Sequence, residues 1–148
     1  KVHMKIKVKK LNDRAVLPVY GSQYAAGADL YACTCEELTI APHATVMVPT
    51  GIALELPVGY AGFVYARSGL ASKRNLAPAN KVGVIDCDYR GEVMVALHNH
   101  GETAQTVAAG ERVAQLVIAP YITAAFEEAE ELSSTVRGEG GFGSTGTK

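Results

Sequence analysis

The run Ile52-Ala53-Leu54-Glu55-Leu56, followed by Pro57-Val58-Gly59, decides the fold class of this chain. Its largest apolar side chains stand at every second position, which is the period of a β-strand and not that of a helix. The proline and the glycine behind it are typical of a turn. The stretch therefore predicts a short strand that ends at a turn.

Short runs of the same kind occur along most of the chain. Lysine alternates with apolar residues over residues 5–9, and turn signals at residues 41–43, 56–59, 101 and 110 separate later runs. The further strand candidates are residues 46–48, 59–66, 82–85, 92–98 and 112–119. Residues 70–73 suggest a short helix, whereas residues 127–132 are too few and too acidic for a core helix. Many short strands at this spacing predict an all-β sandwich or barrel.

Composition limits the size and the class of the protein. A chain of 148 residues and 15.6 kDa has material for one domain. Hydrophobic residues make up 48% and charged residues 20%, which is typical of a soluble globular protein. A net charge of −1 argues against wrapping nucleic acid along a basic face. No apolar run approaches the roughly 20 residues that cross a bilayer, so we expect neither nucleic acid nor membrane as a partner.

The cysteines and the first residues bear on the compartment. Cys33, Cys35 and Cys87 cannot all pair within one chain, and no C-x-x-C pair offers zinc spacing. With no signal peptide pattern, we expect a cytoplasmic protein, or a nuclear or organellar one in a eukaryotic source. Residues 1–3 precede Met4 and add no pattern, so we interpret them as an expression remnant. The expected division is a β domain over residues 4–132 and a flexible tail over residues 133–148.

The tail combines glycine with phosphate-binding residue types. Five of the 15 glycines lie in residues 138–146, and residues 141–146 match G-x-G-x-x-G. A dinucleotide fold needs a strand before this motif and a helix after it, for which the sequence leaves no room. Two interpretations stay open: a disordered end, or a segment whose backbone N–H groups and Arg137 bind phosphate while Phe142 stacks on a base.

Residues 83–92 place two acids, a tyrosine and a glycine between two apolar runs, which predicts a hairpin with a functional loop. Asp86 directly follows the first run, where partial burial could tune it as a general base. The alternative is a solvated turn rich in Asp and Gly.

Three further segments carry polar groups at the ends of strands or within them. Arg67, Ser68 and Gly69 suit the oxygens of a polyphosphate. Ser68 as a nucleophile is the rival, although no G-x-S-x-G elbow surrounds it and the histidines identify no base. Asp29, among small and apolar residues, is either functional or a turn cap. Gln115 lies in an apolar run, where it either binds a ligand or joins a buried hydrogen-bond network.

Taken in order, five segments resemble the five motifs of the trimeric dUTPase family. They read AGADLYA, ARSGLA, GVIDCDYRGE, GERVAQLV and RGEGGFGSTG, and they span residues 26–146. The departures are Ala66, where the family often has proline, and Glu111, where it often has aspartate. Neither position is expected to touch substrate.

This resemblance implies a jelly-roll or distorted β-barrel subunit and a homotrimer with active sites between neighbouring chains. It implies Mg²⁺-dependent hydrolysis of dUTP to dUMP and pyrophosphate, which removes dUTP and supplies dUMP for thymidylate synthesis. By the same resemblance, Asp86 activates the water that attacks the α-phosphorus. Asp29 and Gln115 would hold the Mg²⁺ through water. The residues implied to bind phosphate oxygens near the reaction are Arg67, Ser68, Gly69 and Gln115.

The resemblance also implies how the base and the tail are used. Uracil would be read by the backbone of Gly83, Val84 and Ile85 and by the side chain of Asn80. Tyr89 would exclude a ribose 2′-hydroxyl, and Met94 would pack near the base. The tail would close with Phe142 over uracil. The tail residues implied around the outer phosphates are Arg137, Gly143, Ser144 and Thr145.

Two other functions compete with this one. A dCTP deaminase shares the fold, but the sequence IDCDYRGE and the complete glycine-rich tail favour phosphate hydrolysis. A catalytically silent relative that binds nucleotide or a protein partner is the second alternative, and the full set of polar groups argues against it.

Overall fold

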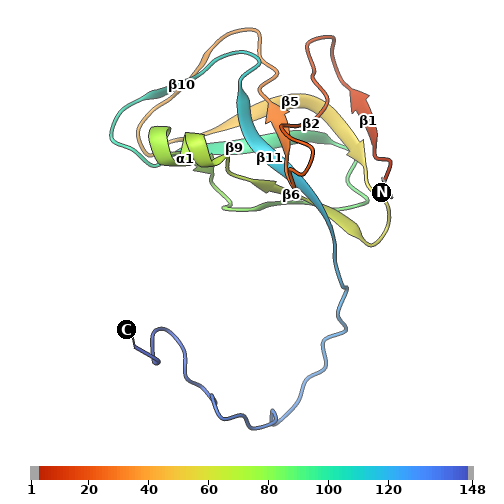
Figure 1. The fold of residues 1–148 in the computed structure, drawn as a ribbon, viewed down its shortest axis with the longest axis vertical. Coiled ribbons are helices and arrows are strands. Elements are labelled where there is room, and N and C mark those ends of the chain that lie inside the picture. The colour runs from red at the N-terminus through yellow and green to blue at the C-terminus, as the bar shows by residue number, and fades with distance from the viewer. Residues whose placement is uncertain (1–3, 147–148) are drawn as a thin grey trace.

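The structure is a computed structural model that describes residues 4–146 (Figure 1), and it is nearly all β, as predicted. The strands up to the helix are β1 (Lys7–Lys10), β2 (Val19–Tyr20), β3 (Ala28–Tyr31), β4 (Leu38–Ile40), β5 (Thr45–Glu55) and β6 (Tyr60–Tyr65). The helix α1 (Ser68–Arg74) follows. The remaining strands are β7 (Leu76–Pro78), β8 (Gly83–Ile85), β9 (Glu92–Asn99), β10 (Gln105–Val107) and β11 (Arg112–Pro120).

Two antiparallel sheets enclose the core, and a small third sheet adjoins them. The four-stranded sheet has the order β1-β5-β9-β7, the five-stranded sheet has the order β2-β3-β11-β6-β8, and β10 pairs with β4. Both large sheets contribute fully buried apolar side chains, among them Leu30, Ile52, Leu97 and Val113. Apolar residues alternate along the strands because one face of each sheet is removed from water.

Strand β5 joins two runs that the sequence analysis treated separately. Its register with β9 shifts between Pro49 and Ala53, and Gly51 in that interval has a φ of 69°. A side chain is strained at such a φ, whereas glycine is not. The Pro-Thr-Gly sequence thus bends one long strand instead of ending it.

The predicted hairpin over residues 83–92 is wrong. Strand β8 pairs with β6 in the five-stranded sheet, whereas β9 pairs with β5 and β7 in the other sheet. Residues 86–91 therefore cross from one sheet to the other. Two apolar runs around an Asp- and Gly-rich loop form a hairpin only when they pair with each other. Here β8 pairs with β6 instead, and Gly83 and Ile85 are buried.

Five short strands were missed because each has only two to four residues and a weak pattern. One of them, β3, contains Asp29, so the turn-cap interpretation of Asp29 is wrong. The helix α1 contains the predicted residues 70–73 and extends them at both ends.

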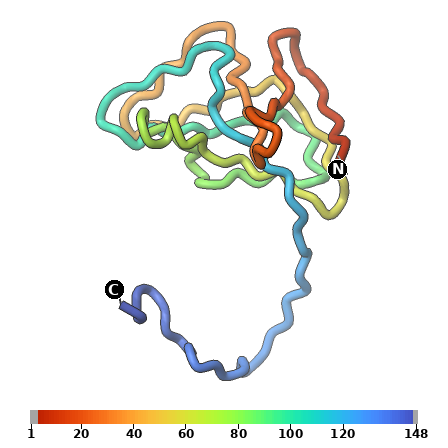
Figure 2. The backbone as a smooth tube through the Cα atoms, viewed as in Figure 1, coloured from red at the N-terminus to blue at the C-terminus, as the bar shows by residue number. Residues whose placement is uncertain are grey.

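The chain leaves the body of the molecule after β11. Residues 121–146 form no helix or strand, and both views show them running away from the sheets in a wide arc (Figures 1 and 2). The residues assigned to an expression remnant, 1–3, and the last two of the tail lie outside the described part. Within residues 4–146, no helix is long and apolar enough to cross a membrane, and Cys33, Cys35 and Cys87 are free.

Candidate active site

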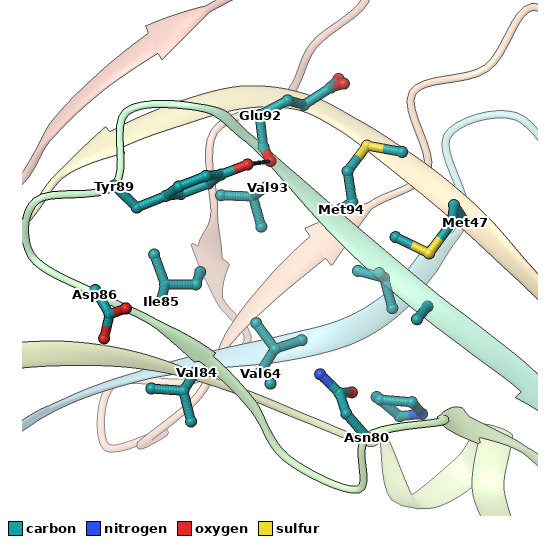
Figure 3. A pocket seen from close by; sticks show the side chains of 14 residues that line it. Met47, Val64, Asn80, Val84, Ile85, Asp86, Tyr89, Glu92, Val93 and Met94 are labelled. Carbon is teal, nitrogen blue, oxygen red and sulfur yellow. Dashed lines mark hydrogen bonds between the residues drawn. The ribbon is translucent and has the colours of Figure 1, made fainter.

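A cavity of about 310 Å³ opens between β8 and β9, and we call it the β8–β9 pocket (Figure 3). Seven of its lining residues belong to the predicted site: Asn80, Gly83, Val84, Ile85, Asp86, Tyr89 and Met94. The lining residues that the sequence analysis did not select are Met47, Val64, Pro78, Glu92, Val93, Val95 and Ala96. The crossing of residues 86–91 between the sheets creates this pocket, because it separates β8 from β9.

The backbone of β8 is available to a ligand at the pocket. Among residues 4–146, this strand is the last in its sheet, so one of its edges is paired with β6 and no strand lies along the other. An unpaired edge presents N–H donors and C=O acceptors in a fixed row, which can recognise the edge of a planar ligand. Gly83 has no side chain and the side chain of Ile85 is buried, so neither covers this edge. Strand β8 therefore offers mainly its backbone.

A tight turn places Asn80 at the mouth of the pocket. The N–H of Val82 donates to the carbonyl of Asn80 at 2.7 Å, and Lys81 between them has a φ of 66°. A Cβ at Gly83 would lie 3.2 Å from Asn80 Nδ2. A larger residue at position 83 would thus press on the Asn80 amide. Asn80 and Asp86 stand at opposite ends of the pocket (Figure 3).

Asp86 lies at the end of β8, and its side chain is exposed. The partial burial expected for it is not found in the single chain. Its carbonyl accepts a hydrogen bond from the N–H of Tyr89 at 3.1 Å. Tyr89 Oη in turn donates to the carbonyl of Glu92 at 2.9 Å (Figure 3). Asp86 and Tyr89 thus belong to one hydrogen-bonded loop.

Within this loop, Cys87 Sγ lies 3.6 Å from Tyr121 Oη. This hydrogen bond raises the pKa of Tyr121 above its ordinary value. Tyr121 is the first residue after β11, and its N–H donates to the carbonyl of Gly59 at 3.0 Å. The start of the C-terminal segment is therefore attached beside the loop of Asp86.

A second cavity, of about 350 Å³, contains the other predicted residues of the body, and we call it the Asp29–Gln115 pocket. Its predicted residues are Asp29, Arg67, Ser68, Gly69 and Gln115, and its other lining residues are Gly21, Ser22, Ala25 and Gly27. Asp29 of β3 and Gln115 of β11 are direct partners in the register. Partners across two strands point to the same face, which explains why segments far apart in sequence meet here.

Ion pairs and hydrogen bonds order this second pocket. Arg67 Nε lies 2.9 Å from Asp29 Oδ1, and both side chains are mostly buried, with exposed fractions of 25% and 14%. Gln115 Nε2 donates to the carbonyl of Ala66 at 2.8 Å. One of the two donors of the Gln115 amide is therefore satisfied, and its Oε1 can accept a hydrogen bond.

Gly27 leaves room for the Gln115 side chain. A Cβ at position 27 would lie 2.2 Å from Gln115 Oε1. We expect Gly27→Ala to displace the Gln115 amide and to break its bond to Ala66, because the end of a long side chain moves more readily than the backbone. Affinity for a polyphosphate ligand should fall about tenfold, as for a lost charge-assisted contact. Thermal melting should shift by only a few degrees; a large loss of stability with normal ligand affinity would contradict this role.

The Asp29–Gln115 pocket fits a magnesium ion held through water. Within residues 4–146, no group of three or more His, Cys, Asp and Glu side chains could hold a metal ion directly. One carboxylate and one amide oxygen are present, and both can accept hydrogen bonds from metal-bound water. Mg²⁺ commonly keeps several waters and takes its other ligands from phosphates. The donor set therefore suits an ion that arrives with a polyphosphate.

Comparison with known proteins shows the family of this chain. The dUTPase family model matches residues 13–146. The deoxyuridine 5'-triphosphate nucleotidohydrolase of Syntrophotalea carbinolica is 52% identical over 141 residues, which cover 95% of this chain and 96% of that protein. The chain belongs to the dUTPase family. The enzyme of the same name from Desulfitobacterium hafniense is 50% identical over 98% of this chain and 97% of its own length.

Solved dUTPase structures share the fold. The dUTPase of Staphylococcus bacteriophage 80alpha with dUPNHPP superimposes with a TM-score of 0.87 at 29% identity, over 96% of this chain and 98% of that one. The predicted fold class is thereby confirmed at the level of the dUTPase fold.

In the single chain, the residues of the predicted dUTPase site lie in three separate places: the two pockets and the tail. None of the described residues lines both pockets. The tail residues Arg137, Phe142, Gly143, Ser144 and Thr145 line neither of them, and Phe142 is fully exposed. Turns at residues 137–140, 141–144 and 143–146 fold the tail on itself. Within residues 4–146, no hydrogen bond joins Ser68 to a histidine, so the structure gives the serine-nucleophile alternative no base.

Proposed function

We propose that the protein hydrolyses dUTP to dUMP and pyrophosphate, with Mg²⁺, in a homotrimer whose active sites combine groups of neighbouring chains. Membership of the dUTPase family makes it a hydrolase of nucleotide metabolism. The reaction removes dUTP and supplies dUMP for thymidylate synthesis. One observation carries the proposal: an unpaired backbone edge in β8 that ends directly at the carboxylate of Asp86.

The β8–β9 pocket is the proposed uracil site. The backbone at Gly83, Val84 and Ile85 offers donors and acceptors in the alternating order that a uracil edge requires, and the Asn80 amide completes the set. Cytosine has a donor where uracil has an acceptor, so its binding would leave polar groups unpaired. Met94 packs beside the base, where its thioether fills apolar space.

Asp86 is the proposed general base. Its carboxylate accepts a proton from water, and the resulting hydroxide attacks the α-phosphorus while the bond to the bridging oxygen breaks and pyrophosphate leaves. Arg67, Ser68, Gly69 and Gln115 bind phosphate oxygens and orient the chain for in-line attack. When bound, Mg²⁺ would neutralise charge on the triphosphate, and Asp29 and Gln115 would hold it through water.

The separation of the two pockets supports a shared active site. The reacting phosphate must meet Asp86 from one pocket and Arg67 from the other, yet these residues lie in different cavities of one chain. A second copy can supply the missing half. The exposed tail, with Arg137, Gly143, Ser144 and Thr145 for outer phosphates and Phe142 for uracil, then closes over the site and excludes water.

Selection against ribose is assigned to Tyr89. Its phenol is held by the bond to Glu92, and a Cβ at Gly91 would lie 2.4 Å from its hydroxyl oxygen. We expect Gly91→Ala to push the ring away and to lower the preference for dUTP over UTP about tenfold, the size of a lost steric or hydrogen-bond discrimination. The ratio of the two kcat/KM values measures this. An unchanged ratio would remove Tyr89 from sugar selection.

A product assay tests the function. The purified protein is incubated with each of the four common deoxynucleoside triphosphates and with dUTP, with and without Mg²⁺, and nucleotide products are separated. We expect dUMP and pyrophosphate from dUTP only, and only with the ion. Ammonia from dCTP would instead identify a deaminase. Tight dUTP binding without any product would identify a silent relative.

A further inference from the structure

The pairing of β11 with β3 contains a β-bulge beside the Asp29–Gln115 pocket. One residue is skipped in the register, whose partners are Gln115↔Asp29, Ala114↔Leu30 and Arg112↔Tyr31. Val113 is therefore the extra residue on β11. Such bulges frequently re-aim a side chain beside a functional site.

The bulge decides which face of the sheet Arg112 occupies. In a regular strand, Arg112 would point to the opposite face from Gln115, three residues away, and therefore into the core. Instead, Val113 and Ala114 are both buried, with exposed fractions of 1% and 0%. The two consecutive inward residues bring Arg112 to the outer face, on which Asp29 and Gln115 lie.

On that face, Arg112 completes a chain of three charges. Its Nη1 lies 3.3 Å from Asp29 Oδ2, while Asp29 Oδ1 pairs with Arg67 Nε at 2.9 Å. Both oxygens of one carboxylate are thus engaged by different guanidinium groups. The terminal nitrogens of Arg67 make no hydrogen bond or ion pair within residues 4–146. They remain for a ligand in the pocket.

We propose that Arg112 is a positioning residue for the triphosphate, acting through Asp29 on Arg67. A carboxylate held at one oxygen can rotate, whereas one held at both has a fixed plane. The fixed plane sets the direction of the Arg67 guanidinium, which binds carboxylates and phosphates in a strict fork geometry. The inference rests on the proposed function, in which Arg67 binds a phosphate oxygen of dUTP.

A double-mutant cycle distinguishes this indirect role from direct phosphate binding by Arg112. The variants Arg112→Gln, Asp29→Asn and the double variant are compared by kcat, by KM for dUTP and by calorimetric titration with a non-hydrolysable dUTP analogue. Deoxyuridine, which lacks phosphate, is titrated as the reference ligand. Lys7→Gln breaks the surface pair of Lys7 with Glu55, 3.2 Å apart and outside both pockets, and serves as the matched control.

We expect Arg112→Gln to raise KM for dUTP and the dissociation constant of the analogue about fivefold, the range of a partly exposed ion pair. Deoxyuridine affinity should change less than twofold, and the melting temperature should shift by only a few degrees. In the Asp29→Asn background, Arg112→Gln should add almost nothing. Arg112→Lys, which can still pair with Asp29, should recover most of the affinity. Lys7→Gln should behave as the unmodified protein.

Two results would overturn the inference. If Arg112→Gln lowered the analogue affinity equally in the unmodified protein and in the Asp29→Asn variant, Arg112 would act on the ligand directly. Unchanged analogue affinity in a folded Arg112→Gln protein would show that the bulge serves packing alone. Failure of the proposed function is distinguishable from both, because it would appear as absent dUTP hydrolysis in the unmodified protein. The titrations would still report how Arg112 affects triphosphate binding.

Discussion

The variant Asp86→Asn is expected to bind dUTP almost normally and to turn it over about a thousandfold more slowly. General-base catalysis contributes roughly 10²–10⁴-fold, and an amide cannot accept the proton of the attacking water. The substitution preserves the size of the side chain and removes its charge. Asp86 is exposed at the end of β8, so the core is untouched. Single-turnover rates and analogue titrations separate the two effects.

Asp88→Asn is the matched control for this variant. Asp88 lies two residues away on the same loop, is also exposed and does not line the β8–β9 pocket. We expect its kcat to stay within about threefold of the unmodified value, as for a surface substitution away from the chemistry. If Asp86→Asn retained near-normal turnover, or if both variants lost activity equally, the base would have to be sought elsewhere.

The strands of the body were predictable where a run was long and alternated. Residues 92–98 and 112–119 fall within one residue of β9 and β11, because one face of each strand is buried and the other is not. Strand β3 escaped prediction because its four residues include a small alanine and a charged aspartate. Its identity as a strand depends on two neighbours, β2 and β11, that are distant in the chain.

The candidate site could be proposed from the sequence as a set of residues, but its shape could not. The resemblance selected Asp86, Tyr89 and Gln115, yet the pattern around Asp86 suggested a hairpin, because local sequence does not reveal that β8 prefers β6. Arg112 was not selected, since alternation would have placed it in the core. The one signal in the sequence is the adjacent apolar pair Val113 and Ala114, which becomes a bulge only when β3 is known as its partner.

Removal of residues 137–148 is expected to leave a stable body with kcat/KM for dUTP lowered about a hundredfold or more. The last strand of the described residues ends at Pro120, and the side chain of Phe142 is fully exposed, so the deletion removes little packing. The melting temperature should therefore change by only a few degrees. The catalytic loss follows from the proposed role of the tail, which binds the outer phosphates and excludes water from the site.

A variant that restores the length of the tail but not its side chains is the control for this deletion. A protein in which a Gly/Ser linker of equal length replaces residues 137–148 should be as inactive as the truncated one. It keeps the backbone freedom but lacks Arg137 and Phe142. Ordering such a segment costs roughly 1–2 kcal/mol per residue, which only contacts with the nucleotide can offset. The oligomeric state of the truncated protein is verified by sedimentation. If its kcat/KM were unchanged, the tail would have no role in catalysis. Activity recovered by the linker would assign the tail a purely steric role.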